Sequence, residues 1–173
     1  MNDLGLWGDT PGSKADLGLS DVGKQQVLDG AKKALAAGIK PDLIICSPLE
    51  RTRETAAIIA EILGYLKDKI KYNDLFLEIQ VGELEGTSFA DFMKEHTYAD
   101  LGKFKGAESI EMLQVRAEQA LDYAKTMPEE TILIVAHSCF GRAFRRVVEG
   151  KPYTDEFSGN NTPLPYGEIL KLI

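Results

Sequence analysis

Two short apolar runs, each followed by a polar turn and then a helix-forming stretch, constrain the fold of this chain most strongly. The first run, 43–46, leads into Ser47 and Pro48, and the second run, 132–136, leads into His137. Continuous apolar runs of this length are typical of strands that are covered on both faces. Strands that alternate with helices therefore predict an α/β fold, a three-layer α/β/α sandwich with a mostly parallel sheet.

Capping signals predict where the helices begin. Ser20 precedes an amphipathic stretch that ends near Ala37 and is followed by Gly38, which is typical of a helix with a serine N-cap and a glycine stop. Ser47, Pro48 and Glu50 have the spacing of a capping box, so Ser47 is expected to cap the helix after the first strand. Further helices are predicted over about 109–125 and 140–148, and further strands over Leu75–Ile79 and Gly167–Ile173.

Length and charge limit the classes of function. The 173 residues suffice for one domain with a buried core, and we expect a single domain over 1–173 in which the mixed segment 82–107 is an insertion that covers the pocket. The net charge of −7 argues against nucleic acid or an anionic membrane as a partner, because both require a basic face. No apolar stretch approaches the roughly 20 residues of a membrane span.

The chain has two cysteines, Cys46 and Cys139, at or near the ends of the two apolar runs. Two such cysteines are expected to be free thiols in a reducing compartment, which indicates a cytoplasmic protein. Cys139 and Arg145 also match the Cys-x5-Arg spacing of cysteine phosphatases, in which a thiolate attacks phosphate. That interpretation is disfavoured, because Phe140 and Phe144 indicate an amphipathic helix where the phosphate cradle requires small residues.

Arg51 and Arg53 fall in the first turn of the predicted helix after Ser47. The amino end of a helix is already partly positive, so a cation is unfavourable there unless an anion is bound close by. A phosphate shared between a guanidinium and free backbone N–H groups satisfies this requirement. We therefore predict that Arg51 binds phosphate, and we expect Arg53 to lie on the surface.

His137 follows the second buried strand, and Ser138 opens the next helix. The carboxyl ends of parallel strands form the ligand crevice of open α/β sheets, so His137 and Arg51 are expected to face the same crevice. A histidine in this place is often only a hydrogen-bonded structural residue, and that alternative stays open. The second histidine, His96, lies in an unrelated polar segment.

A carboxyl group close to a bound phosphate could protonate the leaving oxygen if burial raises its pKa. Glu78, Glu83 and Glu85 lie together in one segment, and their spacing alone does not single out one of them.

Five segments, in order along the chain, resemble motifs of the histidine phosphatase superfamily, the phosphoglycerate-mutase-like proteins. Residues 47–56 resemble its S-P-L-x-R-x-x-x-T-A segment, and residues 135–143 resemble its V-S-H-G-G-x-x-R-A segment. Residues 77–86, 17–26 and the stretch from Gly106 to Arg116 are similar to three further motifs of the family. The resemblance covers essentially the whole chain.

The resemblance implies an α/β sandwich and a phosphohistidine mechanism without metal or other cofactor, acting on a small phosphorylated substrate. By matching positions, Arg51 would hold the phosphoryl group, helped by Ser138, and His137 would stabilise it in the transition state. Glu78 would act as the general acid toward the leaving alcohol. Ser138 and Cys139 replace the Gly-Gly pair of the family, which is expected to tune the site.

The family motif R-H-G-x-T-x-x-N, whose histidine is the nucleophile, is missing from this chain. Met1 and Asn2 resemble its last two positions, which makes Asn2 a candidate phosphate ligand. We therefore expect that the chain starts at an internal methionine, lacks the first strand of the family, and is inactive as written. An alternative is a pseudo-enzyme that binds phosphorylated ligands or a protein partner, and a phosphoglycerate-type mutase is disfavoured because the chain is short.

Overall fold

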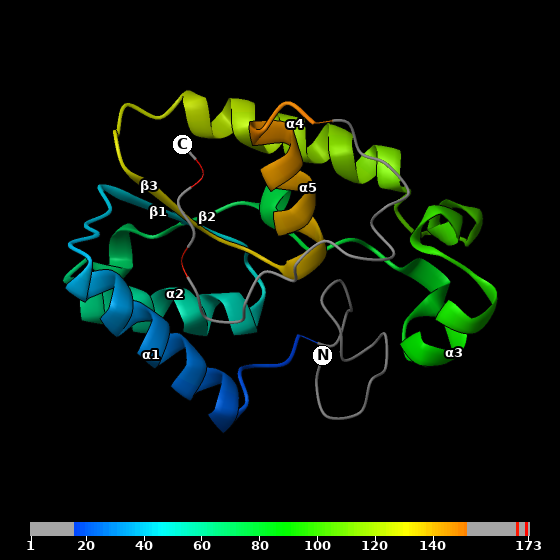
Figure 1. Cartoon of the computed structure of the whole chain (residues 1–173), viewed down its shortest axis with the longest axis horizontal. Coiled ribbons are helices and arrows are strands. Elements are labelled where there is room, and N and C mark those ends of the chain that lie inside the picture. The colour runs from blue at the N-terminus through cyan, green and yellow to red at the C-terminus, as the bar shows by residue number, and fades with distance from the viewer. Residues whose placement is uncertain (1–15, 152–168, 170–171, 173) are drawn as a thin grey trace.

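The computed structural model describes residues 16–151 together with Ile169 and Leu172 (Figure 1). Within them, β1 (Leu43–Cys46), β2 (Lys71–Tyr72) and β3 (Ile132–Val135) form a parallel sheet in the order β2-β1-β3. The register pairs Cys46 with Tyr72 on one side and with Val135 on the other. The carboxyl ends of the three strands therefore meet at one edge of the sheet.

Helices cover both faces of this sheet, as Figure 1 shows, with α1 (Asp21–Ala36) and α2 (Glu50–Leu63) on one side and α4 (Ile110–Lys125) and α5 (Ser138–Val148) on the other. The side chains of β1 alternate between two apolar clusters. Ile44 and Cys46 join the cluster of α1 and α2, and Leu43 and Ile45 join the cluster of α4 and α5. The predicted three-layer α/β/α architecture is confirmed.

Local signals placed several elements correctly. The Ser20 hydroxyl accepts a hydrogen bond from the Gly23 N–H at 3.1 Å and caps α1. The Ser109 hydroxyl accepts one from the Met112 N–H at 3.2 Å and caps α4. Both caps satisfy amide groups that lack a partner within their own helix, so these helix starts depend only on residues close in sequence.

The strand predicted over Leu75–Ile79 is wrong. Asp74–Phe76 forms a turn of 3-10 helix, and the strand beside β1 is Lys71–Tyr72. The carbonyl groups of Leu75 and Leu77 accept hydrogen bonds from Arg116 rather than from a neighbouring strand. The strand predicted over Gly167–Ile173 lies almost entirely outside the described residues, although Ile169 packs against the cluster of α1 and α2.

The segment 82–107 is a loop closed at its base, and it carries α3 (Phe89–Glu95) at the end of the molecule away from α1 (Figure 1). Val81 and Ala107 form an antiparallel bridge. The Glu83 N–H donates to the Lys105 carbonyl at 3.0 Å, and the Lys105 N–H donates to the Glu83 carboxylate at 2.8 Å. Phe92 and Leu101 bury this segment against the core of α4 and α5. Two short 3-10 helices, Gly82–Leu84 and Tyr98–Lys103, lie within this segment, and two more, Lys67–Lys69 and Asp74–Phe76, precede it.

Among the helices of the described residues, none has the length and apolar character needed to cross a membrane.

A substitution at Gly82 tests how the 82–107 loop is closed at its base. Its φ of +56° is left-handed, and a Cβ there would lie 2.3 Å from the Lys105 carbonyl oxygen and 2.4 Å from the Ala107 nitrogen. We expect Gly82→Ala to lower the free energy of unfolding by about 3 kcal/mol, because strain and overlap add. Gly64 has a similar φ of +70° in open space, so Gly64→Ala should cost only about 1 kcal/mol. Equal losses in urea unfolding would contradict this account.

Candidate functional site

Arg51 lies at the start of α2, directly after the carboxyl end of β1. Its Nε and Nη2 atoms are buried and have no hydrogen-bond partner among the described residues. Burial lowers the pKa of the guanidinium, and the charges of Glu78 and Asp16 oppose that change. Buried polar atoms are normally hydrogen-bonded. A guanidinium whose buried N–H donors have no acceptor among the described residues is therefore suited to bind an anion.

Ser47 does not cap α2 as the sequence predicted. The helix begins at Glu50, and Leu49 occupies the N-cap position without a side-chain hydrogen bond. The carboxylate of Asp16 accepts the hydrogen bond from the Glu50 N–H at 2.5 Å. The fully buried Ser47 hydroxyl instead lies 2.7 Å from Nε2 of His137. The prediction is wrong because the Glu50 N–H and the Ser47 hydroxyl both have partners from distant parts of the chain, which local spacing does not reveal.

His137 occupies the N-cap position of α5, at the carboxyl end of β3, and its side chain is buried. Its pKa is lowered well below the ordinary value of 6.5, first by burial and then by the positive charges of Arg51 and Arg116. The imidazole is therefore neutral at neutral pH. A neutral imidazole has one N–H donor and one unprotonated nitrogen.

The carboxylate of Glu78 closes the amino end of α5. Its Oε2 accepts a hydrogen bond from the Cys139 N–H at 3.0 Å, and its Oε1 accepts one from the Phe140 N–H at 2.8 Å. Burial raises the pKa of this carboxyl, although the backbone N–H groups and Arg51 act in the opposite direction. Of the three carboxylates that spacing could not separate, Glu78 is the one that is buried beside Arg51 and His137. A carboxyl with a raised pKa is suited to donate a proton.

Arg116 of α4 holds the loop that carries Glu78. Its Nε and Nη2 bind the two carboxylate oxygens of Glu108 at 2.8 and 2.6 Å. Its Nη1 donates to the carbonyls of Leu75 and Leu77, at 3.0 and 2.6 Å. The sequence placed Glu108 and Arg116 in a motif but assigned no role to them. The sequence feature that could have indicated a structural role is that Arg116, a charged residue, lies within the apolar face of a predicted helix.

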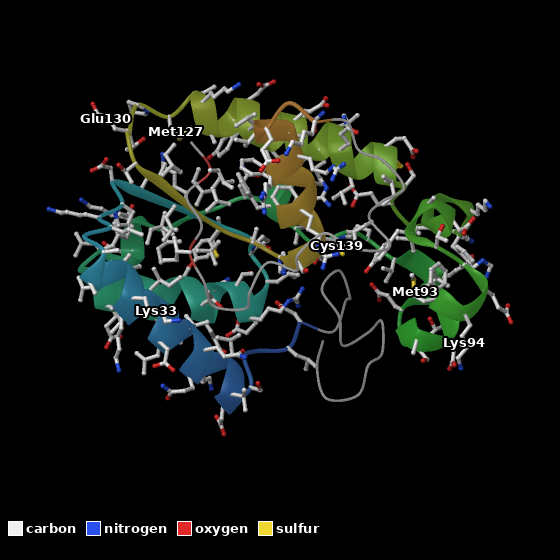
Figure 2. All side chains as sticks on the ribbon, viewed as in Figure 1. Lys33, Met93, Lys94, Met127, Glu130 and Cys139 are labelled. Carbon is white, nitrogen blue, oxygen red and sulfur yellow. The ribbon has the colours of Figure 1, made fainter. Side chains whose placement is uncertain are left out.

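The Cys-x5-Arg interpretation does not fit the structure. Cys139 is the second residue of α5, whose amino end it marks in Figure 2, so the residues that follow it form a helix rather than a phosphate-binding loop. Burial, and next the negative charge of Glu78, raise the pKa of that thiol, which opposes formation of a thiolate. Arg145 pairs with Glu149 at 2.7 Å on the outside of the helix.

The remaining predicted residues have different outcomes. Ser138 is the first residue of α5 and lies beside His137, whereas Asn2 lies outside the described residues. Arg53 is exposed, as expected, and its guanidinium lies 4.9 Å from the centre of the Tyr72 ring. The ring of His96 packs against the rings of two phenylalanines of the 82–107 segment, with centroid distances of 5.0 and 5.4 Å.

No group of three or more His, Cys, Asp or Glu side chains in the described part of the chain is arranged to hold a metal ion.

The fold and the site together define a three-layer α/β protein in which an arginine with buried donor atoms, a buried histidine and a buried carboxyl group share one electrostatic environment. The arginine and the histidine follow the carboxyl ends of two neighbouring parallel strands. The chain belongs to the histidine phosphatase superfamily (branch 1), whose family model matches residues 7–164.

Sequence relatives include phosphoglycerate mutases. A 2,3-bisphosphoglycerate-dependent phosphoglycerate mutase of Parvibaculum lavamentivorans is 26% identical over 144 residues, which are 77% of this chain and 67% of the relative. The Erwinia tasmaniensis protein GpmB, named as a phosphoglycerate mutase, is 29% identical over 133 residues, which are 72% of this chain and 60% of the relative. The chain thus spans about two thirds or less of the length of these curated relatives.

The fold is similar to that of a mycobacterial glucosyl-3-phosphoglycerate phosphatase. The TM-score is 0.67 at 20% identity, and the match covers 84% of this chain and 75% of the phosphatase. Further structures of that phosphatase contain inorganic phosphate or VO3. At this level of identity the likeness establishes the fold.

Arg116 tests whether the Glu78 loop depends on this clamp. We expect Arg116→Lys to lower the free energy of unfolding by about 3 kcal/mol, because lysine retains the charge but leaves buried acceptors of the carboxylate and the carbonyls unpaired. The control Arg145→Lys changes a pair on the surface and should cost less than about 0.5 kcal/mol. Urea unfolding measures both, and a small loss for Arg116→Lys would contradict the clamp.

The lowered pKa of His137 predicts a pH dependence of stability. On acidification below about 6.5 the unfolded chain binds a proton at His137 while the folded chain does not, so stability is lost as the pH falls. The loss continues down to the folded pKa with a slope of up to about 1.4 kcal/mol per pH unit. We expect the stability difference between the wild type and His137→Gln to change with this slope. Parallel curves of unfolding free energy against pH would contradict it.

Proposed function

We propose that this chain binds small phosphomonoesters at the carboxyl ends of its strands, with Arg51 as the main ligand of the phosphoryl group. The single observation that carries the proposal is that Nε and Nη2 of Arg51 are buried without a hydrogen-bond partner among the described residues. A phosphoryl group has negative charge and two adjacent acceptor oxygens, and these can serve as the missing hydrogen-bond partners of the Arg51 guanidinium.

The groups around Arg51 support the same anion. The charge of Arg51 acts on both His137 and Glu78, so the three side chains share one electrostatic environment. The amide groups of Cys139 and Phe140 are already bound by Glu78, which leaves the amide of Ser138 as a further donor at the start of α5. His137 supplies one imidazole N–H, and Asn2 remains a candidate ligand by resemblance. Backbone and imidazole donors that surround an oxyanion stabilise it without reorganisation.

Glu78 would act as the general acid in any hydrolysis at this site. Burial raises its pKa, which favours the protonated form that a general acid needs, and the charge of Arg51 acts on it. In hydrolysis without a covalent intermediate, a water oxygen would form a bond to phosphorus as the P–O bond to the alcohol breaks and the proton of Glu78 passes to the alcohol oxygen. The proton released by the water would then return to Glu78, which leaves inorganic phosphate and the free alcohol.

A covalent phosphohistidine requires an imidazole nitrogen that is free to attack phosphorus. Nε2 of His137 is engaged by Ser47, and the other ring nitrogen of His137 is the N–H donor assigned to the phosphoryl group above. The ring of His96 packs against two aromatic side chains. We therefore propose that the chain as written binds phosphomonoesters but does not form a phosphohistidine. This combines the phosphatase-like site with the pseudo-enzyme alternative, and the substrates named for its relatives suggest a phosphorylated sugar or sugar acid as the ligand class.

Arg51→Ala tests the phosphate site. We expect the variant to bind inorganic phosphate at least about 100-fold more weakly by isothermal titration calorimetry, because charge-assisted hydrogen bonds are lost. It should unfold no more easily than the wild type, since the residue removed is a desolvated cation with unpaired donors. Arg53→Ala is the matched control and should keep phosphate affinity.

Two results would contradict the proposal. Unchanged phosphate affinity in Arg51→Ala would remove Arg51 from the site. Hydrolysis of an aryl phosphate by the wild type at a rate well above that of Arg51→Ala, with an acid-labile phosphohistidine, would overturn the proposed absence of that intermediate while supporting the site.

A further inference from the structure

The hydroxyl of Ser47 is held in one place by the sheet. The Ser47 N–H donates to the Val135 carbonyl at 2.9 Å, which continues the pairing of β1 with β3. The Ser47 carbonyl accepts a hydrogen bond from the Thr52 hydroxyl at 3.0 Å. The side chain is completely buried, and its Oγ lies 2.7 Å from Nε2 of His137. Both backbone groups of Ser47 are thus fixed, so the hydroxyl has a defined position relative to the ring.

This geometry bears on which ring nitrogen carries the proton. Among the described residues the Ser47 hydroxyl has no hydrogen-bond partner other than His137. A buried hydroxyl needs an acceptor for its proton, and within the described part of the chain the acceptor in hydrogen-bonding reach is the lone pair of Nε2. If Ser47 donates to Nε2, that nitrogen is unprotonated and the proton of the neutral ring is on Nδ1.

Nδ1 is the nitrogen that remains for a ligand. No hydrogen bond within the described residues uses it, and the positive charges that act on the ring come from Arg51 of α2 and Arg116 of α4. The carboxylate of Glu78 is bound to the first turn of α5, the helix that begins directly after His137. An Nδ1–H in this environment is a donor without an acceptor, next to the buried donors of Arg51.

We propose that Ser47 is a positioning residue that holds His137 as the Nδ1–H tautomer, so that Nδ1–H donates to an oxygen of the bound phosphoryl group. The role of the tautomer in binding rests on the function proposed above, whereas the tautomer itself does not. Ser47 acts through His137 and does not contact the phosphoryl group. Ser47, which local spacing had predicted as a helix cap, thus has the role of orienting His137 in this proposal.

The tautomer is measured directly in the full chain by 15N NMR of its imidazole groups. The chain has two histidines, so His96→Gln assigns the signals of His137. We expect an Nδ1 signal of the protonated type and an Nε2 signal of the unprotonated type near neutral pH. The opposite assignment in the wild type overturns the proposal without the need for any Ser47 variant.

Ser47→Ala and Ser47→Thr test the dependence on the hydroxyl. Ser47→Ala should lose the preference for Nδ1–H and bind inorganic phosphate about tenfold more weakly, because the donor is no longer held in place. Ser47→Thr retains the hydroxyl and should restore both. Ser20→Ala removes the cap of α1 and is the control for lost stability, so it should unfold more easily yet keep the tautomer and the phosphate affinity.

The outcomes separate this proposal from the proposed function. An Nδ1–H tautomer that is lost in Ser47→Ala, in a wild type that binds no phosphate, supports the positioning role and overturns the proposed function. Phosphate binding that depends on Arg51 but is unchanged in Ser47→Ala, with the tautomer also unchanged, supports the proposed function and overturns the role of Ser47.

Discussion

The buried ion pair between Arg116 and Glu108 is the interaction on which the arrangement of the site depends. Arg116 binds Glu108 through two nitrogens and also donates to carbonyls of the loop that precedes Glu78. That loop pairs with no strand among the residues that the structure describes, and a side chain of α4 satisfies its backbone acceptors. Its position determines that the Glu78 carboxylate meets the amino end of α5. The cost of desolvating an arginine is thus offset by acceptors from two segments.

Carboxylates from elsewhere in the chain close the amino ends of both helices that border the site. Asp16 accepts the first amide of α2, and Glu78 accepts amides of α5. This arrangement matches the helix dipoles and places negative charge around Arg51, whose pKa those charges help to maintain against burial. Ser47 is consequently not needed as a cap and is available to His137. Because Asp16 caps α2 in place of Ser47, the Ser47 hydroxyl can contact the imidazole of His137.

The elements that were predicted correctly depend on neighbours in sequence. Ser20 and Ser109 cap their helices because each accepts from an amide three residues later, and 43–46 and 132–136 are apolar because both faces of the sheet are covered. The wrong predictions have long-range causes. Ser47 is 90 positions from His137, and the carbonyl of Leu75 is 41 positions from Arg116. A local pattern contains no information about such partners, and here they outweighed it.

The sequence by itself determined the α/β class, the positions of β1 and β3 with the helices around them, and the presence of an arginine and a histidine after these neighbouring strands, because periodicity and apolar runs are local properties. Only the tertiary structure decided which of three clustered glutamates is buried beside Arg51, which hydroxyl contacts His137, and which guanidinium nitrogens are left without a partner. These features arise from burial and from contacts between segments far apart in the chain. The charge state and donor atoms of the site follow from them, since pKa values depend on the packed environment.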